Sequence, residues 1–175
     1  QATLEDEDSI TSASINTLNK IDFLYGRIEV RARIPSALGS WPAIWMLGTN
    51  KSETGWPACG EIDIVEILGM NNPGNQINAT LHWQDPNAGG PLNHAEFGDT
   101  YNLSSGNFDD QFHVYSLIWK ENQIQALVDD QVYFTISTTS ANLSEFRERF
   151  YLIFNVAVGG NSVGSPNAST IFPKY

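Results

Sequence analysis

The sequence is short of basic residues. It holds nine Lys and Arg against 20 Asp and Glu, a formal net charge of −11. Nucleic acid is an improbable partner for so acidic a chain, because binding to phosphates requires a basic face. An anionic polysaccharide would also be repelled, so a neutral ligand suits this charge balance best. The same charge is equally well explained as an aid to solubility alone.

Cysteine and long hydrophobic runs are also scarce. Cys59 is the only cysteine, which excludes an intrachain disulfide and a zinc site built from cysteines. All three histidines are distant from it in sequence, so we expect a buried structural thiol rather than a nucleophile. No apolar run approaches the ~20 residues that a membrane-spanning helix needs, so we expect no membrane partner. The first residues, QATLEDEDS, are polar and show no signal peptide, which in a trimmed chain says nothing about secretion.

The hydrophobic pattern predicts a single all-β domain over residues 1–175. Residues 26–35 alternate apolar and charged side chains, which is typical of a half-solvated antiparallel strand. A helix is predicted only over 140–149, and the Gly-, Pro- and Asn-rich segments 69–75 and 84–110 are expected to be loops. Many short strands with turns between them favour a sandwich or a barrel. The other predicted strands are 41–47, 61–68, 76–83, 112–119, 123–136 (a hairpin turning at Asp129–Asp130) and 150–158.

Three acids stand inside the apolar strand GEIDIVEILG at residues 60–69. Side chains alternate along a strand, so Glu61 and Asp63 share a face, whereas Glu66 should point to the other one. One extra residue in the strand, a β-bulge near Ile64–Val65, would return Glu66 to the acidic face. The sequence therefore predicts such a bulge.

The acids of this strand admit a structural and a functional interpretation. They could form the solvated face of an edge strand, where charge discourages association. No basic residue is interleaved with them, however, and three crowded carboxylates repel, so at least one pKa should rise. Two carboxylates of unequal pKa suit glycoside hydrolysis, in which one attacks the anomeric carbon and the other protonates the leaving oxygen.

A sugar-binding cleft also needs aromatic side chains, which offer flat apolar faces to a pyranose. The chain has five tryptophans. Trp41 and Trp56 are flanked by glycine and proline in GSWP and TGWP, where ligand contact and core packing are about equally plausible. Trp119 ends an apolar strand, so we expect it in the core.

Several motifs resemble those of glycoside hydrolase family 16, in particular its laminarinase-type endo-β-1,3-glucanases. They follow one another in the family's order and span the chain from about residue 9 to residue 173. The extra residue in E-x-D-x-x-E matches the laminarinase type rather than the lichenase type. The motifs are WPAIWMLG (41–48), GEIDIVE (60–66), TLHW (80–83), FHVYSLIW (112–119) and NVAVGGN (155–161).

The resemblance implies a β-jelly-roll sandwich and a retaining mechanism of double displacement. Glu61 would be the nucleophile and Glu66 the general acid/base. Asp63 would hydrogen-bond Glu61 at the glycosyl-enzyme stage, and its charge would keep Glu66 protonated. The resemblance further implies that the substrate is bound by Trp41, Trp45, Trp56, His82 and Asn155; for His82, a structural cross-strand role is the alternative.

Family members carry further strands before and after the stretch that this chain matches. We therefore expect a jelly roll without the usual first strands and last strand, and an exposed sheet edge open to a complementing fragment or to self-association. The resemblance implies no cofactor for catalysis. The family's structural calcium site uses the terminal segments, so calcium has little support here.

The resemblance implies a secreted enzyme, extracellular or periplasmic, that hydrolyses β-1,3-glucan. Two alternatives remain open at this point. The same fold could act on mixed-linkage glucan or on a galactan such as agarose, although a sulfated galactan should need basic residues in the cleft. The domain could also be a non-catalytic glucan-binding module, which the three intact acids disfavour.

Overall fold

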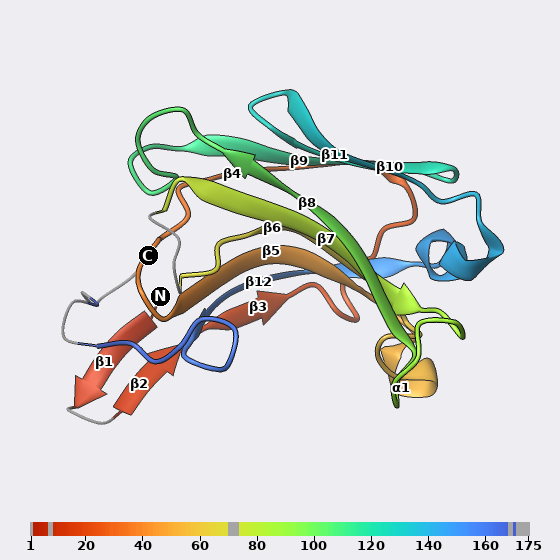
Figure 1. Ribbon diagram of the computed structural model, residues 1–175, viewed down its shortest axis with the longest axis horizontal. Coiled ribbons are helices and arrows are strands. Elements are labelled where there is room, and N and C mark those ends of the chain that lie inside the picture. Colours follow the sequence, from red (N-terminus) through yellow and green to blue (C-terminus); the bar gives the residue numbers. More distant parts are fainter. Residues whose placement is uncertain (1, 7–8, 70–73, 168–169, 171–175) are drawn as a thin grey trace.

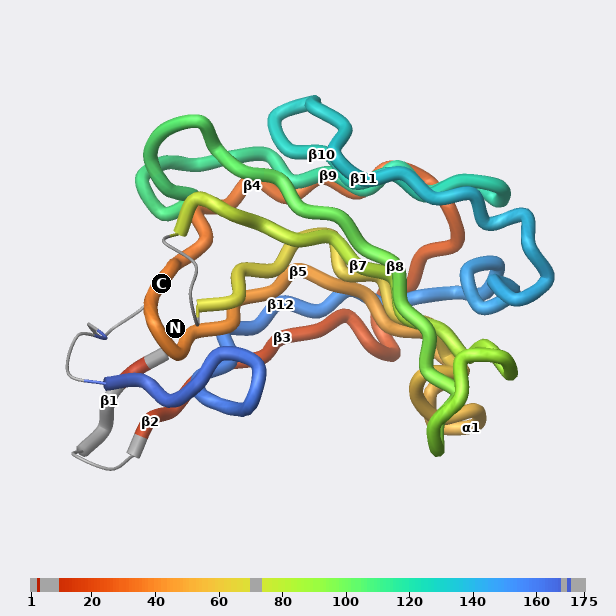
Figure 2. The backbone as a smooth tube through the Cα atoms, viewed as in Figure 1, coloured from red at the N-terminus to blue at the C-terminus, as the bar shows by residue number. Residues whose placement is uncertain are grey.

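The structure is a computed structural model that describes residues 2–6, 9–69, 74–167 and 170. It is a β-sandwich of two antiparallel sheets with the jelly-roll architecture that the sequence predicts (Figures 1 and 2). Both helices are short, and within the described ranges none has the length and apolar character needed to cross a membrane. The elements are β1 (Ala2–Asp6), β2 (Ser9–Ser12), β3 (Ser14–Asn16), β4 (Gly26–Ala32), β5 (Ser40–Gly48), α1 (Lys51–Thr54), β6 (Glu61–Glu66), β7 (Gln76–Gln84), β8 (His94–Asn102), β9 (His113–Lys120), β10 (Gln123–Val128), β11 (Gln131–Ser137), the 3-10 helix η1 (Ala141–Arg147) and β12 (Phe150–Val158).

Six strands form the larger sheet, in the order β3-β12-β5-β6-β7-β8, and four form the smaller one, β11-β10-β9-β4. β1 and β2 pair only with each other. The main core lies between the two sheets and is built from alternate strand residues, among them Met46, Ile62, Leu117 and Trp119. Burial of Trp119 confirms its expected core position.

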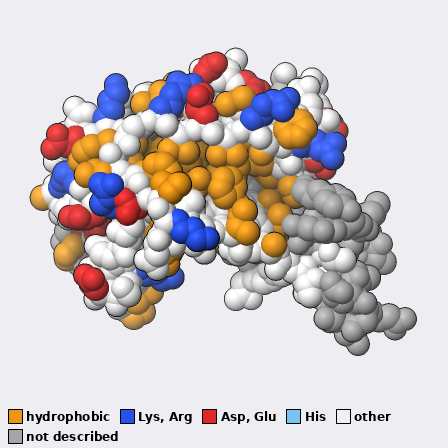
Figure 3. Space-filling view, turned by 180° about the vertical axis from the view of Figure 1, so that it is seen from behind, with side chains coloured by type: hydrophobic (Ala, Val, Ile, Leu, Met, Phe, Trp, Pro, Cys, Tyr) orange, Lys and Arg blue, Asp and Glu red, His pale blue; other side chains and the backbone are white. Residues whose placement is uncertain are grey.

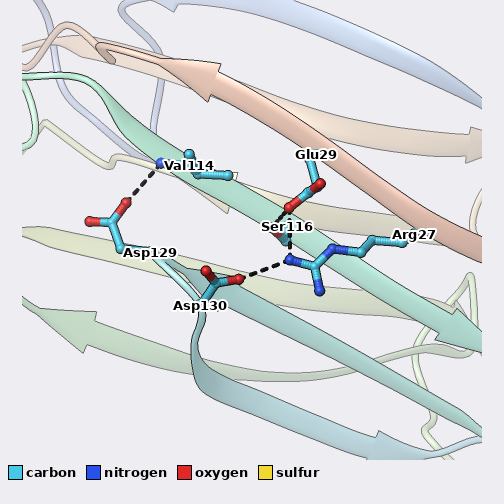
Figure 4. A network of polar contacts seen from close by, with 6 residues as sticks. All are labelled: Arg27, Glu29, Val114, Ser116, Asp129 and Asp130. Atoms are coloured by element: carbon cyan, nitrogen blue, oxygen red, sulfur yellow. Dashed lines mark hydrogen bonds and ion pairs between the residues drawn. The ribbon is translucent and has the colours of Figure 1, made fainter.

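The hairpin of β10 and β11 turns as predicted. Asp129 and Asp130 both have positive φ, 47° and 64°, as a two-residue type I′ turn requires. The Asp129 carboxylate accepts a hydrogen bond from the Val114 backbone N–H, and Asp130 accepts one of 2.9 Å from Arg27 on β4 (Figure 4). The turn is thus held against β9 and β4, the other two strands of its sheet.

Two expectations need correction. Residues 94–102, which were expected to belong to a loop, form β8, which pairs with β7 along nine residues. The period-2 signal failed because β8 is an edge strand with polar residues on both faces, and even Phe97 is half exposed. The helix predicted over 140–149 is present as the 3-10 helix η1, capped by the Ser140 side chain, but it was expected to be the only one, and the short helix α1 also forms at Lys51–Thr54.

The sandwich is open along one side, between the edge strands β3 and β4. The described residues supply no further strand to either edge. A cavity of about 350 Å³ lies there, lined by apolar side chains that include Ile34, Ile44 and Phe154. Seen from behind, apolar side chains gather over a hollow in this surface (Figure 3). The exposed edge that the sequence predicts is therefore present in the described part of the chain.

Candidate active site

The acidic strand β6 carries the predicted bulge. Asp63 pairs with Thr80 on β7, and Glu66 pairs with Asn78, so three steps on β6 face two on β7. On the other side, β5 pairs with Asp63 and with Val65 and skips Ile64. Ile64 is the extra residue, and it turns Glu66 to the face that Glu61 and Asp63 share.

The bulge also keeps the apolar residues of β6 on the core side. Ile62, Ile64, Val65 and Ile67 all belong to the main core and are almost fully buried. The acidic face points the other way, where Trp45 and Trp56 pack against a small second cluster. This cluster contains Cys59, which is buried, as expected of a structural thiol.

Each catalytic candidate of β6 has a specific partner. The indole N–H of Trp56 donates to Glu61 Oε2 at 2.7 Å, and that of Trp41 donates to Glu66 Oε1 at 2.6 Å. Asp63 is 3% exposed and hydrogen-bonds Glu61, while its Oδ2 lies 3.0 Å from His82 Nε2. The two tryptophans therefore orient the outer acids, a role that their flanking residues in the sequence did not reveal.

All three acids hold protons more tightly than exposed carboxylates do. Burial raises the pKa of Glu66 to about 8, with a smaller contribution from the nearby Asp63 charge. Burial also raises the pKa of Asp63 well above its usual range, and Glu61 adds to the effect. The pKa of Glu61 rises as well, again by burial, but the His82 charge and the Trp56 donor oppose the rise. Burial is thus a larger cause of Glu66 protonation than the Asp63 charge, to which the family resemblance assigns it.

A pocket of about 200 Å³ brings the acids together with other predicted residues. Trp45 and Asn155 line it and are joined by a hydrogen bond of 2.6 Å from indole N–H to amide oxygen. Trp56 and His82 contact the acids without lining this pocket. The lining residues are Trp41, Ala43, Trp45, Glu61, Asp63, Glu66, Asn155 and Ala157.

Glu66 also lines a second pocket, of about 300 Å³, on the side of β7 and β8. Its walls include the polar residues Asn78, Thr80, Asp99 and Thr100. Glu66 thus stands between two spaces, one shared with Glu61 and one not. A group that protonates a glycosidic oxygen needs this position, with a sugar on either side.

Two residues near the acids were missed from the sequence, because β8 was expected to be a loop. His82 pairs across strands with both Glu61 and Glu96, and Gln84 pairs with His94. The same face of the sheet therefore carries a row that runs from Glu61 through His82 to Glu96, with His94 beside it. The His94 ring lies 4.7 Å from the Trp56 ring.

The model of glycosyl hydrolases family 16 matches residues 2–168, nearly the whole chain. The chain belongs to this family. Curated proteins of similar sequence include glucan endo-1,3-β-glucosidase A1 of Niallia circulans, 39% identical over 92% of this chain and 24% of its own length. The β-1,3-glucan-binding protein of Penaeus monodon is 38% identical, over 87% of this chain and 48% of its own length.

Solved structures of similar sequence share the fold. The laminarinase catalytic domain of Thermotoga maritima MSB8, crystallised in complex with cetyltrimethylammonium bromide, superposes with a TM-score of 0.84. It is 40% identical, and the match covers 98% of this chain and 69% of that one. The chain spans about a quarter and about half of the two curated relatives named above, so it corresponds to one region of those proteins.

Proposed function

We propose that the chain is the catalytic region of an endo-acting β-1,3-glucanase that hydrolyses laminarin-type glucan with retention of configuration. The observation that carries the proposal is the bulged strand β6, which sets Glu61, Asp63 and Glu66 on one face of a family 16 sandwich. The similarity to endo-1,3-β-glucanases supports the choice of linkage.

In the first step, the Glu61 carboxylate attacks the anomeric carbon while Glu66 gives its proton to the departing glycosidic oxygen. Glu66 is suited to this because a pKa of about 8 keeps it protonated at neutral pH. The Trp56 N–H and the hydrogen bond with Asp63 stabilise the ionised Glu61 that attacks. The products of the step are a glycosyl ester on Glu61 and a shortened glucan with a free hydroxyl.

In the second step, the Glu66 carboxylate takes a proton from water, and the water oxygen attacks the same anomeric carbon. The ester bond breaks, Glu61 regains its charge and Glu66 its proton, so no atom or charge is left over. Two inversions at one carbon retain its configuration. No cofactor takes part in this scheme, and we expect chelators to leave hydrolysis unchanged.

A neutral glucan suits the pocket better than a sulfated galactan does. Among the residues that the structure describes, no Lys or Arg lines the pocket of the three acids, so a sulfate group would meet only negatively charged side chains there. A glucan polymer is too large to cross a membrane. We therefore further propose that the protein acts outside the cytoplasm, in the extracellular space or the periplasm.

Because one relative is named a glucan-binding protein, a second candidate is a binding module without catalysis. Release of reducing sugar from laminarin separates the two. We expect release by the wild type, none by Glu61→Gln, and wild-type rates for Glu53→Gln, a control on the exposed surface of α1. Laminarin binding without any release by the wild type would favour the binding module and overturn the enzyme.

A further inference from the structure

A second group of side chains, next to the pocket of the three acids, has the geometry of a metal site. His82 Nδ1, His94 Nε2 and Glu96 Oε2 lie 2.9, 3.3 and 3.7 Å apart pairwise. Zinc bonds of about 2.0–2.2 Å at tetrahedral angles would set ligand atoms about 3.3–3.6 Å apart. The three atoms thus already stand near the corners of one face of a zinc tetrahedron.

The protonation of this group leaves it with too few donors. Asp63 Oδ2 lies 3.0 Å from His82 Nε2, and with the His82 proton on Nε2 the Nδ1 atom presents a lone pair to His94 and Glu96. Glu96 only accepts, so the single N–H of a neutral His94 would have to serve two acceptors. A cation at the centre of the three atoms satisfies all of them.

The surroundings suit an ion that enters from solvent. His82 is 17% exposed, His94 30% and Glu96 61%, so the site opens outward. The Trp56 ring, 4.7 Å from the His94 ring, covers one flank with an apolar surface. Asp63 Oδ2 lies behind His82, 3.0 Å from Nε2, which is where a carboxylate–histidine–metal arrangement places its carboxylate.

We propose that His82, His94 and Glu96 bind a divalent transition-metal ion of the Zn²⁺ class, with water in the fourth position. Two imidazoles and one carboxylate form a ligand set that zinc uses with one open site. Imidazole nitrogens disfavour calcium and magnesium, which prefer oxygen. The inference rests on geometry alone and holds whether or not the chain hydrolyses glucan.

A second set of potential ligands, Glu61, Asp63 and His82, also converges among the described residues. We favour the first set because it supplies two imidazoles and an open approach. In the second set, Asp63 is buried and already hydrogen-bonded to Glu61. Glu61→Gln therefore distinguishes the two, since it removes a ligand only from the second set.

Calorimetric titration of metal-free, tag-free protein with ZnCl₂, above the usual histidine pKa, tests the proposal. We expect one ion per chain with a dissociation constant in the micromolar range. His94→Gln and Glu96→Gln should each weaken binding at least tenfold, while Glu61→Gln and the surface control Glu53→Gln should bind like the wild type. Co²⁺ should give the visible absorption of a tetrahedral complex in the wild type and lose it in His94→Gln.

Thermal unfolding of each metal-free variant verifies that the substitutions leave the fold intact. Equal affinity in the wild type and His94→Gln would overturn the proposal, as would the absence of stoichiometric binding. Loss of binding in Glu61→Gln would place the ion on Glu61, Asp63 and His82 instead, which also overturns the proposal.

Discussion

The hydroxyl of Tyr133 donates a hydrogen bond of 2.9 Å to the backbone oxygen of Ile64, the extra residue of the bulge in β6. Tyr133 belongs to β11, so the smaller sheet reaches across the sandwich to the irregular point of the acidic strand. A bulge leaves backbone groups outside the regular ladder, and an unsatisfied buried carbonyl is costly. Tyr133 thereby secures the feature that aims Glu66.

Tyr133→Phe should lower both stability and turnover. Loss of the bond to a buried carbonyl should cost about 1–3 kcal/mol in the free energy of unfolding, measured with a chemical denaturant. If the bulge relaxes, kcat should fall while KM changes little, because the loss concerns the placement of Glu66. Tyr101→Phe is the matched control, since its hydroxyl bonds the exposed Gln131. Equal effects of the two substitutions would contradict this role.

The activity profile should fall on the alkaline side with a midpoint near pH 8. Glu66 must be protonated to act as an acid, and its pKa is raised to about 8. On the acid side, activity should decline as Glu61 takes up a proton, at a pH above the usual range of a glutamate, because its pKa is raised. The check is kcat/KM against pH. The variant Glu66→Gln can still be assayed with an activated aryl glycoside, whose leaving group needs no proton. If its activity also falls on the alkaline side, a group other than Glu66 titrates there.

Glu66 should also make the protein less stable as pH rises. An unfolded glutamate ionises near 4.5, whereas folded Glu66 keeps its proton to about pH 8. Between these values the native state binds more protons than the unfolded state, so stability falls with rising pH, by about 1.4 kcal/mol per pH unit. Glu66→Gln should remove roughly 3 kcal/mol of this loss between pH 4.5 and pH 7. Parallel stability curves for variant and wild type would refute the shift.

Trp56 should contribute to turnover through its indole N–H, in addition to any contribution from the packing of its ring. Trp56→Phe keeps an aromatic ring but removes the donor to Glu61. A hydrogen bond to a charged group is worth about 1.5–3 kcal/mol, so kcat should drop roughly 10- to 100-fold. Trp45→Phe removes the comparable bond to Asn155, which is uncharged, and should affect kcat less. The reverse order of the two variants would be inconsistent with this assignment.

The bulge could be predicted because Glu61, Asp63 and Glu66 cannot share one face of a regular strand. Pattern and spacing also located the hairpin at Asp129–Asp130, where the turn chemistry is local. β8 could not be found in this way, because an exposed edge strand has no buried face to impose an alternation. His94 and Glu96 were missed with it.

Contacts between the two sheets cannot be predicted from sequence pattern and spacing. Nothing near Tyr133 in the sequence points to Ile64, some 70 residues earlier, because the bond follows from how the two sheets pack. The same holds for the indole bonds of Trp41 and Trp56, whose flanking residues made ligand contact and core packing about equally plausible and did not reveal the acids that they orient.

The most direct test of the central claim is to trap the covalent intermediate. A 2-deoxy-2-fluoro β-1,3-glucosyl substrate with a good leaving group slows the second step, so a glycosyl ester should accumulate and be found by mass spectrometry of peptides. We predict one added glycosyl unit, on Glu61. An adduct on Glu66, or turnover of laminarin that inverts the anomeric configuration, would contradict the roles given to the acids of β6.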